Sequence, residues 1–278
     1  MPTWICDGCG LEHPDSPEPP PDGGCVLDRG EVGIEERGDI GRHGQRWITH
    51  EELAAQPHRT VHRDHGLGLH SFRREPRFAI GQWSFLARTP HGNLLWDPPA
   101  YLDDEVVDLV GELGGAAVVA TSHPHMFAAQ VSWSHAFGRV PVLVNADDLE
   151  WLPRTDPVLE PWRDLAEPLP GIRLIQLGGH MRGSSVALTG DGSLLTGDTI
   201  SGVPTGYPGW VSFTRNYPKL VPMSPAVVRR IVDRLDAYEY DRLYTLGGDA
   251  VERDAKRVVH RSAESHIRWA SGEFDHLT

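Results

Sequence analysis

The stretch "TSHPHMFAAQ", residues 121–130, places two histidines on either side of a proline, directly after the apolar run "GGAAVVA" (114–120). A buried strand that ends in a loop is where α/β proteins place their chemistry. Pro124 favours extended backbone at His123, and residues two apart in an extended chain project to the same side. We therefore expect His123 and His125 to converge on one point, as two metal ligands do. Taken alone, the stretch also fits two loop histidines with ordinary hydrogen bonds.

Two later strand ends offer further ligands. The predicted strand "IRLIQL" (172–177) ends in "GGHMRGSS" (178–185), which delivers His180 from a glycine-flanked turn. The predicted strand "SLLT" (193–196) ends in "GDT" (197–199), which delivers Asp198 in the same way. Four candidate ligands thus follow three strands, in the order His-x-His, Gly-Gly-His and Gly-Asp.

This order resembles the metallo-β-lactamase superfamily over roughly residues 76–278. The matching segments are "SHPH", "LGGHMRGSS" and "LLTGDT", and "NLLWD" (93–97) resembles the early strand of that family that ends in aspartate. The resemblance implies an α/β (α+β) fold, the αββα sandwich of that superfamily. It also implies a metal-dependent hydrolase.

The chain departs from the family pattern at three ligand positions. The usual first motif is His-x-His-x-Asp-His, whereas this chain has Phe127 and Ala128 at the last two positions. The final histidine of the family falls on or beside Gly248 in "YTLGGDA" (244–250). The resemblance therefore implies one metal ion in place of two. Its ligands would be His123, His125, His180 and Asp198, with Asp198 as fourth ligand or near neighbour.

The candidate ligands fit more than one metal and more than one reaction. Three nitrogen ligands and an open position suit zinc, which lowers the pKa of a bound water to about 7. We therefore predict a zinc hydrolase of a small organic substrate. Two histidines with Asp198 would also form the facial triad of a non-haem iron oxygenase. A third alternative is a binding protein without activity on the same fold. Besides Asp198, the candidate catalytic group is Asp249, which follows the vacant final-histidine position as a substitute acid or base.

Residues 201–223, "SGVPTGYPGWVSFTRNYPKLVPM", follow Asp198 and combine aromatic with cationic side chains. Such loops carry specificity at strand ends. The alternative is that the aromatic side chains pack the loop onto the body of the protein. The candidate substrate-binding residues are Tyr207, Trp210, Phe213 and Arg215.

All three cysteines lie in the first 25 residues. "CDGC" (6–9) and "CVLD" (25–28) are similar to the knuckles of rubredoxin-like and zinc-ribbon modules. That similarity implies a structural metal held by Cys6, Cys9, Cys25 and Asp28, since zinc accepts a carboxylate. His13 or His43 would be the fourth ligand instead, or the knuckle is degenerate and binds no metal. We predict this segment over residues 1–60 and the metallo-β-lactamase-fold domain over residues 61–278.

Composition excludes several classes of function. With 278 residues, 39% hydrophobic, the chain is long enough for a sizeable core. Its formal net charge of −13 disfavours nucleic acid as a partner. No run of 18 apolar residues suggests a membrane span, and "MPTWICDGCG" is not a secretory signal. We expect a cytoplasmic protein with a small-molecule substrate; oligomeric state is not predicted.

Local patterns predict the elements around these motifs. They indicate a hairpin over 78–97 and helices over 49–56, 101–113, 126–137, 224–238 and 252–269. Further strands are predicted over 140–145, 184–189 and 241–246. The histidine-rich "HRTVHRDHGLGLH" (58–70) is predicted to be an exposed connection.

Overall fold

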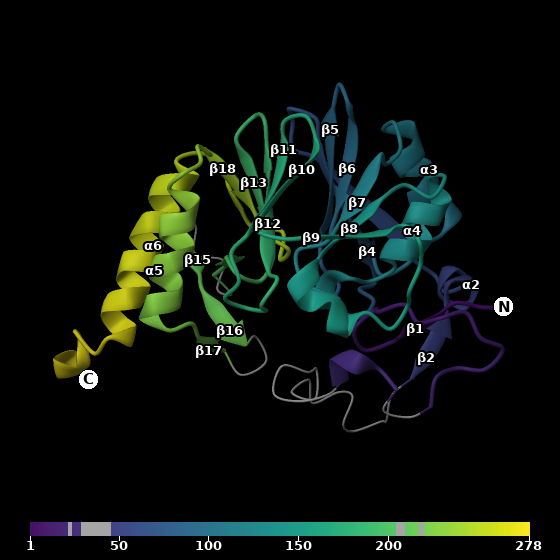
Figure 1. Cartoon of the computed structure of the whole chain (residues 1–278), viewed down its shortest axis with the longest axis horizontal. Coiled ribbons are helices and arrows are strands. Elements are labelled where there is room, and N and C mark those ends of the chain that lie inside the picture. The colour runs from purple at the N-terminus through teal and green to yellow at the C-terminus, as the bar shows by residue number, and fades with distance from the viewer. Residues whose placement is uncertain (22–23, 29–45, 204–208, 217–219) are drawn as a thin grey trace. The chain divides into compact units, whose positions relative to one another are not determined.

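The computed structural model describes residues 1–21, 24–28, 46–203, 209–216 and 220–278 (Figure 1). These residues form two compact units, Met1–Trp162 and Arg163–Thr278. The candidate residues His43 and Tyr207 lie outside the described residues, as does the side chain of Asp28. Within the described part, no helix has both the length and the apolar character needed to cross a bilayer.

The first unit is built on a seven-stranded sheet. Strands β3 to β6 pair antiparallel, and β6 to β9 pair parallel. The order across the sheet is the order along the chain: β3 (Arg59–Asp64), β4 (Leu69–Glu75), β5 (Ser84–Thr89), β6 (Gly92–Trp96), β7 (Val118–Ala120), β8 (Val142–Asn145) and β9 (Leu159–Trp162). The parallel half brings the carboxyl ends of β6, β7 and β8 to one edge, which is where α/β sheets place functional loops.

Among the described residues, the first unit has three α-helices: α2 (His50–Ala54), α3 (Asp104–Glu112) and α4 (Gln130–Ala136). The side chain of Asp103 caps α3 by accepting from the Val106 amide, and the predicted capping box of Thr49 and Glu52 begins α2. The unit also holds the 3-10 turns η1 (Val26–Asp28), η3 (Pro124–Met126) and η4 (Ala146–Trp151), and the two-stranded sheet of β1 (Trp4–Cys6) and β2 (Trp47–Thr49).

The second unit is built on a six-stranded sheet. Its order is β10 (Leu165–Leu169), β11 (Ile172–Gln176), β12 (Ser185–Thr189), β13 (Ser193–Thr196), β18 (Arg242–Tyr244) and β19 (Ala250–Val251). Strands β13 and β18 are parallel, so their carboxyl ends share one edge. Two small sheets precede the helices: β14 (Ser201–Gly202) with β15 (Val211–Ser212), and β16 (Thr214–Asn216) with β17 (Val221–Pro222).

Helices α5 (Pro225–Leu235) and α6 (Ala255–Ala270) lie side by side in this unit (Figure 1), and the short turn η5 (Asp275–Leu277) follows. Ser224 caps α5 and Pro225 occupies its first position, as predicted. The apolar stripe of α5 packs into the core of the unit through Val228, Ile231 and Leu235.

Most predicted elements are confirmed, but the prediction of an exposed connection over residues 58–70 is wrong. Residues in this stretch form β3 and the start of β4, paired antiparallel from Arg59↔Glu75 to Asp64↔His70. The predicted helix over 126–137 begins later, at Gln130, because Pro124–Met126 forms a 3-10 turn. The proposed boundary at residue 60 stays a prediction.

Candidate metal centre

The first pair of candidate ligands follows β7. His123 has extended backbone, with φ −172° and ψ 172°, as expected before a proline. His125 lies inside the 3-10 turn η3, so the expectation of an extended segment is wrong for this residue. The turn still brings the rings together, with centroids 5.1 Å apart and planes at 77°. One ring nitrogen of His123 lies within 4.8 Å of one ring nitrogen of His125.

Two buried polar residues hold this loop in place. Asp97, at the end of β6, accepts a hydrogen bond from the Ser122 amide over 2.6 Å. The Ser122 hydroxyl lies 2.8 Å from Nδ1 of His123. Because Nδ1 is engaged by this hydroxyl, Nε2 is the nitrogen of His123 that suits a metal. Sequence reasoning singled out Asp97 but missed Ser122.

The second pair of candidate ligands lies in the second unit. His180 is buried, and its Nε2 lies 3.7 Å from Oδ2 of Asp198, whose side chain is 20% exposed. Gly179 precedes the histidine with φ +91°, and an added Cβ would lie 2.9 Å from Sδ of Met223. Only glycine fits this close approach without a shift of its neighbours. Arg215 donates a hydrogen bond to the His180 carbonyl oxygen, and this bond fixes the backbone of His180.

The positions of the second metal ligands of the superfamily are structural in this chain. Phe127 and Ala128 are each 1% exposed, and Phe127 belongs to the hydrophobic core of the first unit. The Ala128 carbonyl accepts a hydrogen bond from the Glu12 amide. Gly248 has φ +89° and forms a turn by donating its amide to the Thr245 carbonyl. None of these three residues offers a metal-binding side chain.

A pocket of the second unit lies beside the carboxyl end of β18. Its lining includes Gly202, Trp210, Thr245 and Asp249. The Asp249 carboxylate packs so closely on Gly202 that a Cβ there would clash with it. Trp210 also stacks under the Arg261 guanidinium, 4.4 Å from the ring centroid.

The remaining two candidate substrate-binding residues lie elsewhere in the unit. Phe213 is 1% exposed, and its ring meets the His266 ring at a centroid distance of 5.8 Å. Phe213 belongs to the apolar core of the unit. For this residue the structure therefore has the alternative arrangement, in which an aromatic side chain packs the loop onto the body of the protein. Arg215 is half-buried and engaged with the His180 backbone.

The three cysteines form a buried thiol cluster in the first unit, comprising Cys6, Cys9 and Cys25. Their sulfurs lie within 4.8 Å of one another, and none of the three cysteines forms a disulfide. The Cys9 and Cys25 sulfurs are 3.6 Å apart, far beyond the 2.05 Å of a bond. Burial raises the pKa of the Cys9 thiol, and a hydrogen bond to Cys6 raises the pKa of the Cys25 thiol. The cluster therefore favours protonated thiols until a cation replaces the protons.

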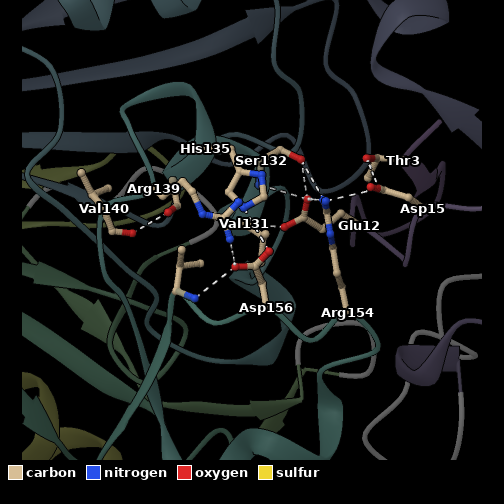
Figure 2. Close-up of polar contacts among 12 residues, drawn as sticks. Thr3, Glu12, Asp15, Val131, Ser132, His135, Arg139, Val140, Arg154 and Asp156 are labelled. Carbon is tan, nitrogen blue, oxygen red and sulfur yellow. Dashed lines mark hydrogen bonds and ion pairs between the residues drawn. The ribbon is translucent and has the colours of Figure 1, made fainter. Parts of the chain in front are cut away.

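Glu12 joins this N-terminal segment to the helix that follows the first histidine pair (Figure 2). Its carboxylate accepts from the amides of Val131 and Ser132, from the Ser132 hydroxyl and from Arg154 at 2.7 Å. Burial raises the pKa of Glu12, while Arg154 and the hydrogen bonds oppose the rise. A carboxylate at the first turn of α4 also complements the helix dipole. Nothing in the sequence around Glu12 indicates this role.

No protein-family model matches the chain. Over 99% of its length, the chain is 34% identical to the uncharacterized protein YmaE of Bacillus subtilis (strain 168), which is covered in full. The chain belongs to the YmaE family.

Solved structures show the fold of this YmaE-family protein. The metallo-β-lactamase FIM-1 from Pseudomonas aeruginosa matches 77% of the chain and 98% of its own, with a TM-score of 0.54 and 13% identity. The Flv1 flavodiiron core from Synechocystis matches 76% of the chain and 62% of its own, with a TM-score of 0.56 and 14% identity. The predicted metallo-β-lactamase fold is thereby confirmed.

Proposed function

We propose that this YmaE-family protein is a mononuclear metal-dependent hydrolase of a small organic substrate. The observation that carries the proposal is the pairing of ligands at strand ends: His123 with His125, and His180 with Asp198. We propose that the two pairs hold one ion together, in the order in which the metallo-β-lactamase fold supplies its ligands. The FIM-1 structure, which shares this fold, is described as a mono-zinc form.

The donor set fits zinc. Three imidazoles and one carboxylate are ordinary zinc ligands, and Ser122 holds the tautomer of His123 through Nδ1. Zinc bound there would polarise a carbonyl or phosphoryl oxygen and lower the pKa of water to about 7. Buried Phe127 and Ala128 argue against a second ion beside the first.

We assign proton transfer to Asp249. This carboxylate lines the pocket beside Trp210, and β13, which leads to Asp198, runs parallel to β18, which leads to Asp249. Both aspartates therefore follow strands that end at the same edge of one sheet. In the proposed step, the oxygen of water bonds to the acyl or phosphoryl centre of the substrate, and Asp249 accepts the proton. The bond to the leaving group breaks, and Asp249 returns the proton to that group.

A second candidate is an iron oxygenase that uses the same ligands. The observation that favours it is the carboxylate of Asp198 beside His180, because a carboxylate with two histidines is the ligand set of non-haem iron enzymes. The Flv1 core, which shares the fold, is described as flavodiiron and metal-soaked.

The test compares an anaerobic assay with an aerobic assay that records oxygen uptake, both on metal-depleted protein reconstituted with zinc or ferrous iron. A substrate panel comprises a chromogenic ester, a lactone, a thioester, a β-lactam and a phosphodiester. We expect turnover without oxygen, and Asp249→Asn should lower kcat about 100-fold at unchanged metal content. The matched control is Glu252→Gln, an exposed acidic residue of the same unit.

Three results would overturn the proposal. Oxygen uptake coupled to product formation would favour the oxygenase. Full kcat in Asp249→Asn would remove the assigned proton acceptor. The third result is a protein that turns over no compound of the panel with either metal, yet gains thermal stability when one of these compounds is added. Such a protein would be a binding protein.

A further inference from the structure

We propose that His13 is the fourth ligand of a zinc ion held by the thiol cluster. The site would be a Cys₃His centre, separate from the metal centre proposed above and independent of the catalytic function. The sequence alone left Asp28, His13 and His43 as rivals for this place.

Strand pairing brings His13 to the face of β1 that carries Cys6. The His13 amide donates to the Trp4 carbonyl, and the Cys6 amide donates to the Leu11 carbonyl. In this antiparallel arrangement His13 is a diagonal neighbour of Cys6, and such neighbours project from one face within reach of a long side chain.

Trp47 fixes the direction of the imidazole. Trp47 pairs directly with Cys6 from the opposite side of β1, so the two side chains share a face. The His13 ring meets the Trp47 ring edge-on, with centroids 4.5 Å apart. To reach Trp47 from beyond β1, the His13 side chain crosses the face of the strand that bears Cys6.

The Nε2 nitrogen of His13 is buried without a hydrogen bond among the described residues. His13 is 3% exposed. Such a buried nitrogen is costly unless a ligand satisfies it. A zinc–nitrogen bond would do so, and the neutral imidazole adds no further negative charge to three thiolates.

The thiol cluster already has the spacing that zinc requires. Four ligands placed tetrahedrally, with sulfur at about 2.3 Å, put two sulfurs about 3.8 Å apart. The Cys9 and Cys25 sulfurs lie 3.6 Å apart. The group within 4.8 Å comprises the three sulfurs and not His13, so we infer that the imidazole closes onto the ion as it binds.

The experiment uses the full chain and two readouts. Zinc affinity is measured by competition with a chromogenic chelator, and the cobalt-substituted protein gives the thiolate-to-metal absorption. We expect His13→Ala to weaken zinc binding at the cluster about 100-fold and to change the cobalt bands. His13→Cys should keep tight binding and increase the thiolate absorption. This variant keeps the test decisive if His13→Ala fails to fold.

Two control variants separate ligation from packing. His50→Ala removes another largely buried imidazole of the first unit and should leave zinc affinity unchanged. Asp28→Asn should do the same. Unchanged affinity in a folded His13→Ala protein, an unchanged thiolate band in His13→Cys, or a loss confined to Asp28→Asn would overturn the assignment. So would a wild-type cluster that binds no zinc.

Discussion

Replacement of Glu12 by alanine tests a buried ion pair that joins the N-terminal segment to the rest of the first unit. The carboxylate receives four hydrogen bonds: 2.5 Å from the Val131 amide, 3.2 Å and 2.6 Å from the Ser132 amide and hydroxyl, and 2.7 Å from Arg154. Its removal leaves Arg154, whose side chain is 11% exposed, with the exposed Asp15 at 3.2 Å as an ion-pair partner. Removing one member of a buried ion pair costs about 3–5 kcal/mol.

Because Asp15 retains part of the interaction with Arg154, we expect the lower part of that range. Glu12→Ala should therefore reduce the free energy of unfolding by about 3–4 kcal/mol, a large share of the roughly 5–15 kcal/mol typical of a folded protein. Glu12→Gln keeps the shape and one acceptor oxygen but loses the charge, and should cost about 2 kcal/mol.

Urea unfolding followed by tryptophan fluorescence measures these changes. The exposed Glu18→Ala is the matched control and should shift the free energy by less than about 0.5 kcal/mol. A double-mutant cycle with Arg154→Met should give a coupling energy above about 1.5 kcal/mol. A loss below about 1 kcal/mol in Glu12→Ala, or additive single effects with Arg154→Met, would show that the Glu12–Arg154 pair does not stabilise the fold in this way.

Three further predictions concern pH, ligand positioning and backbone geometry. Burial lowers the pKa of His50 to about 4 from 6.5, so the unfolded chain binds the proton more readily and stability falls as pH drops from about 6.5 to about 4. The pKa shift corresponds to about 3 kcal/mol of unfolding free energy. Over the same pH interval, the free energy of unfolding of His50→Gln, measured by chemical denaturation, should fall by about 3 kcal/mol less than that of the wild type. Ser122→Ala removes the hydroxyl beside Nδ1 of His123 and should weaken metal binding about 10- to 100-fold in chelator competition, whereas exposed Ser271→Ala should not. Gly179→Ala should destabilise the protein by about 1–3 kcal/mol, since it combines positive φ with contact on Met223; Gly111→Ala in α3, with open space around it, should stabilise by up to about 1 kcal/mol.

The sequence predicted the parts of the site that depend on local order. Strand, turn and ligand follow one another within a few residues at His180 and Asp198, and the structure has β11 and β13 ending before these residues. The capping signals of Thr49 and Ser224 are equally local, and both helices begin where expected.

The sequence did not predict features that depend on distant partners. The side chains of β3 are all half-buried or exposed, so its sequence lacks the alternation of apolar and polar residues that predicts a strand. Its pairing with β4 is therefore visible only in the structure. Glu12 and Arg154 lie 142 positions apart, and no local pattern joins them. The orientation of His13 likewise depends on Trp47, which reaches the same face through β2.

The shared metal centre is tested most directly by the metal content of four proteins: wild type, His123→Ala, His180→Ala and the double variant. We expect two metal equivalents in wild type, one at the histidine site and one at the thiol cluster. Each single variant and the double variant should hold one, because both histidines serve the same ion. His135→Ala, a histidine of α4 that pairs with Asp156, is the control and should keep both. A double variant that loses one equivalent more than either single variant would contradict the shared metal centre.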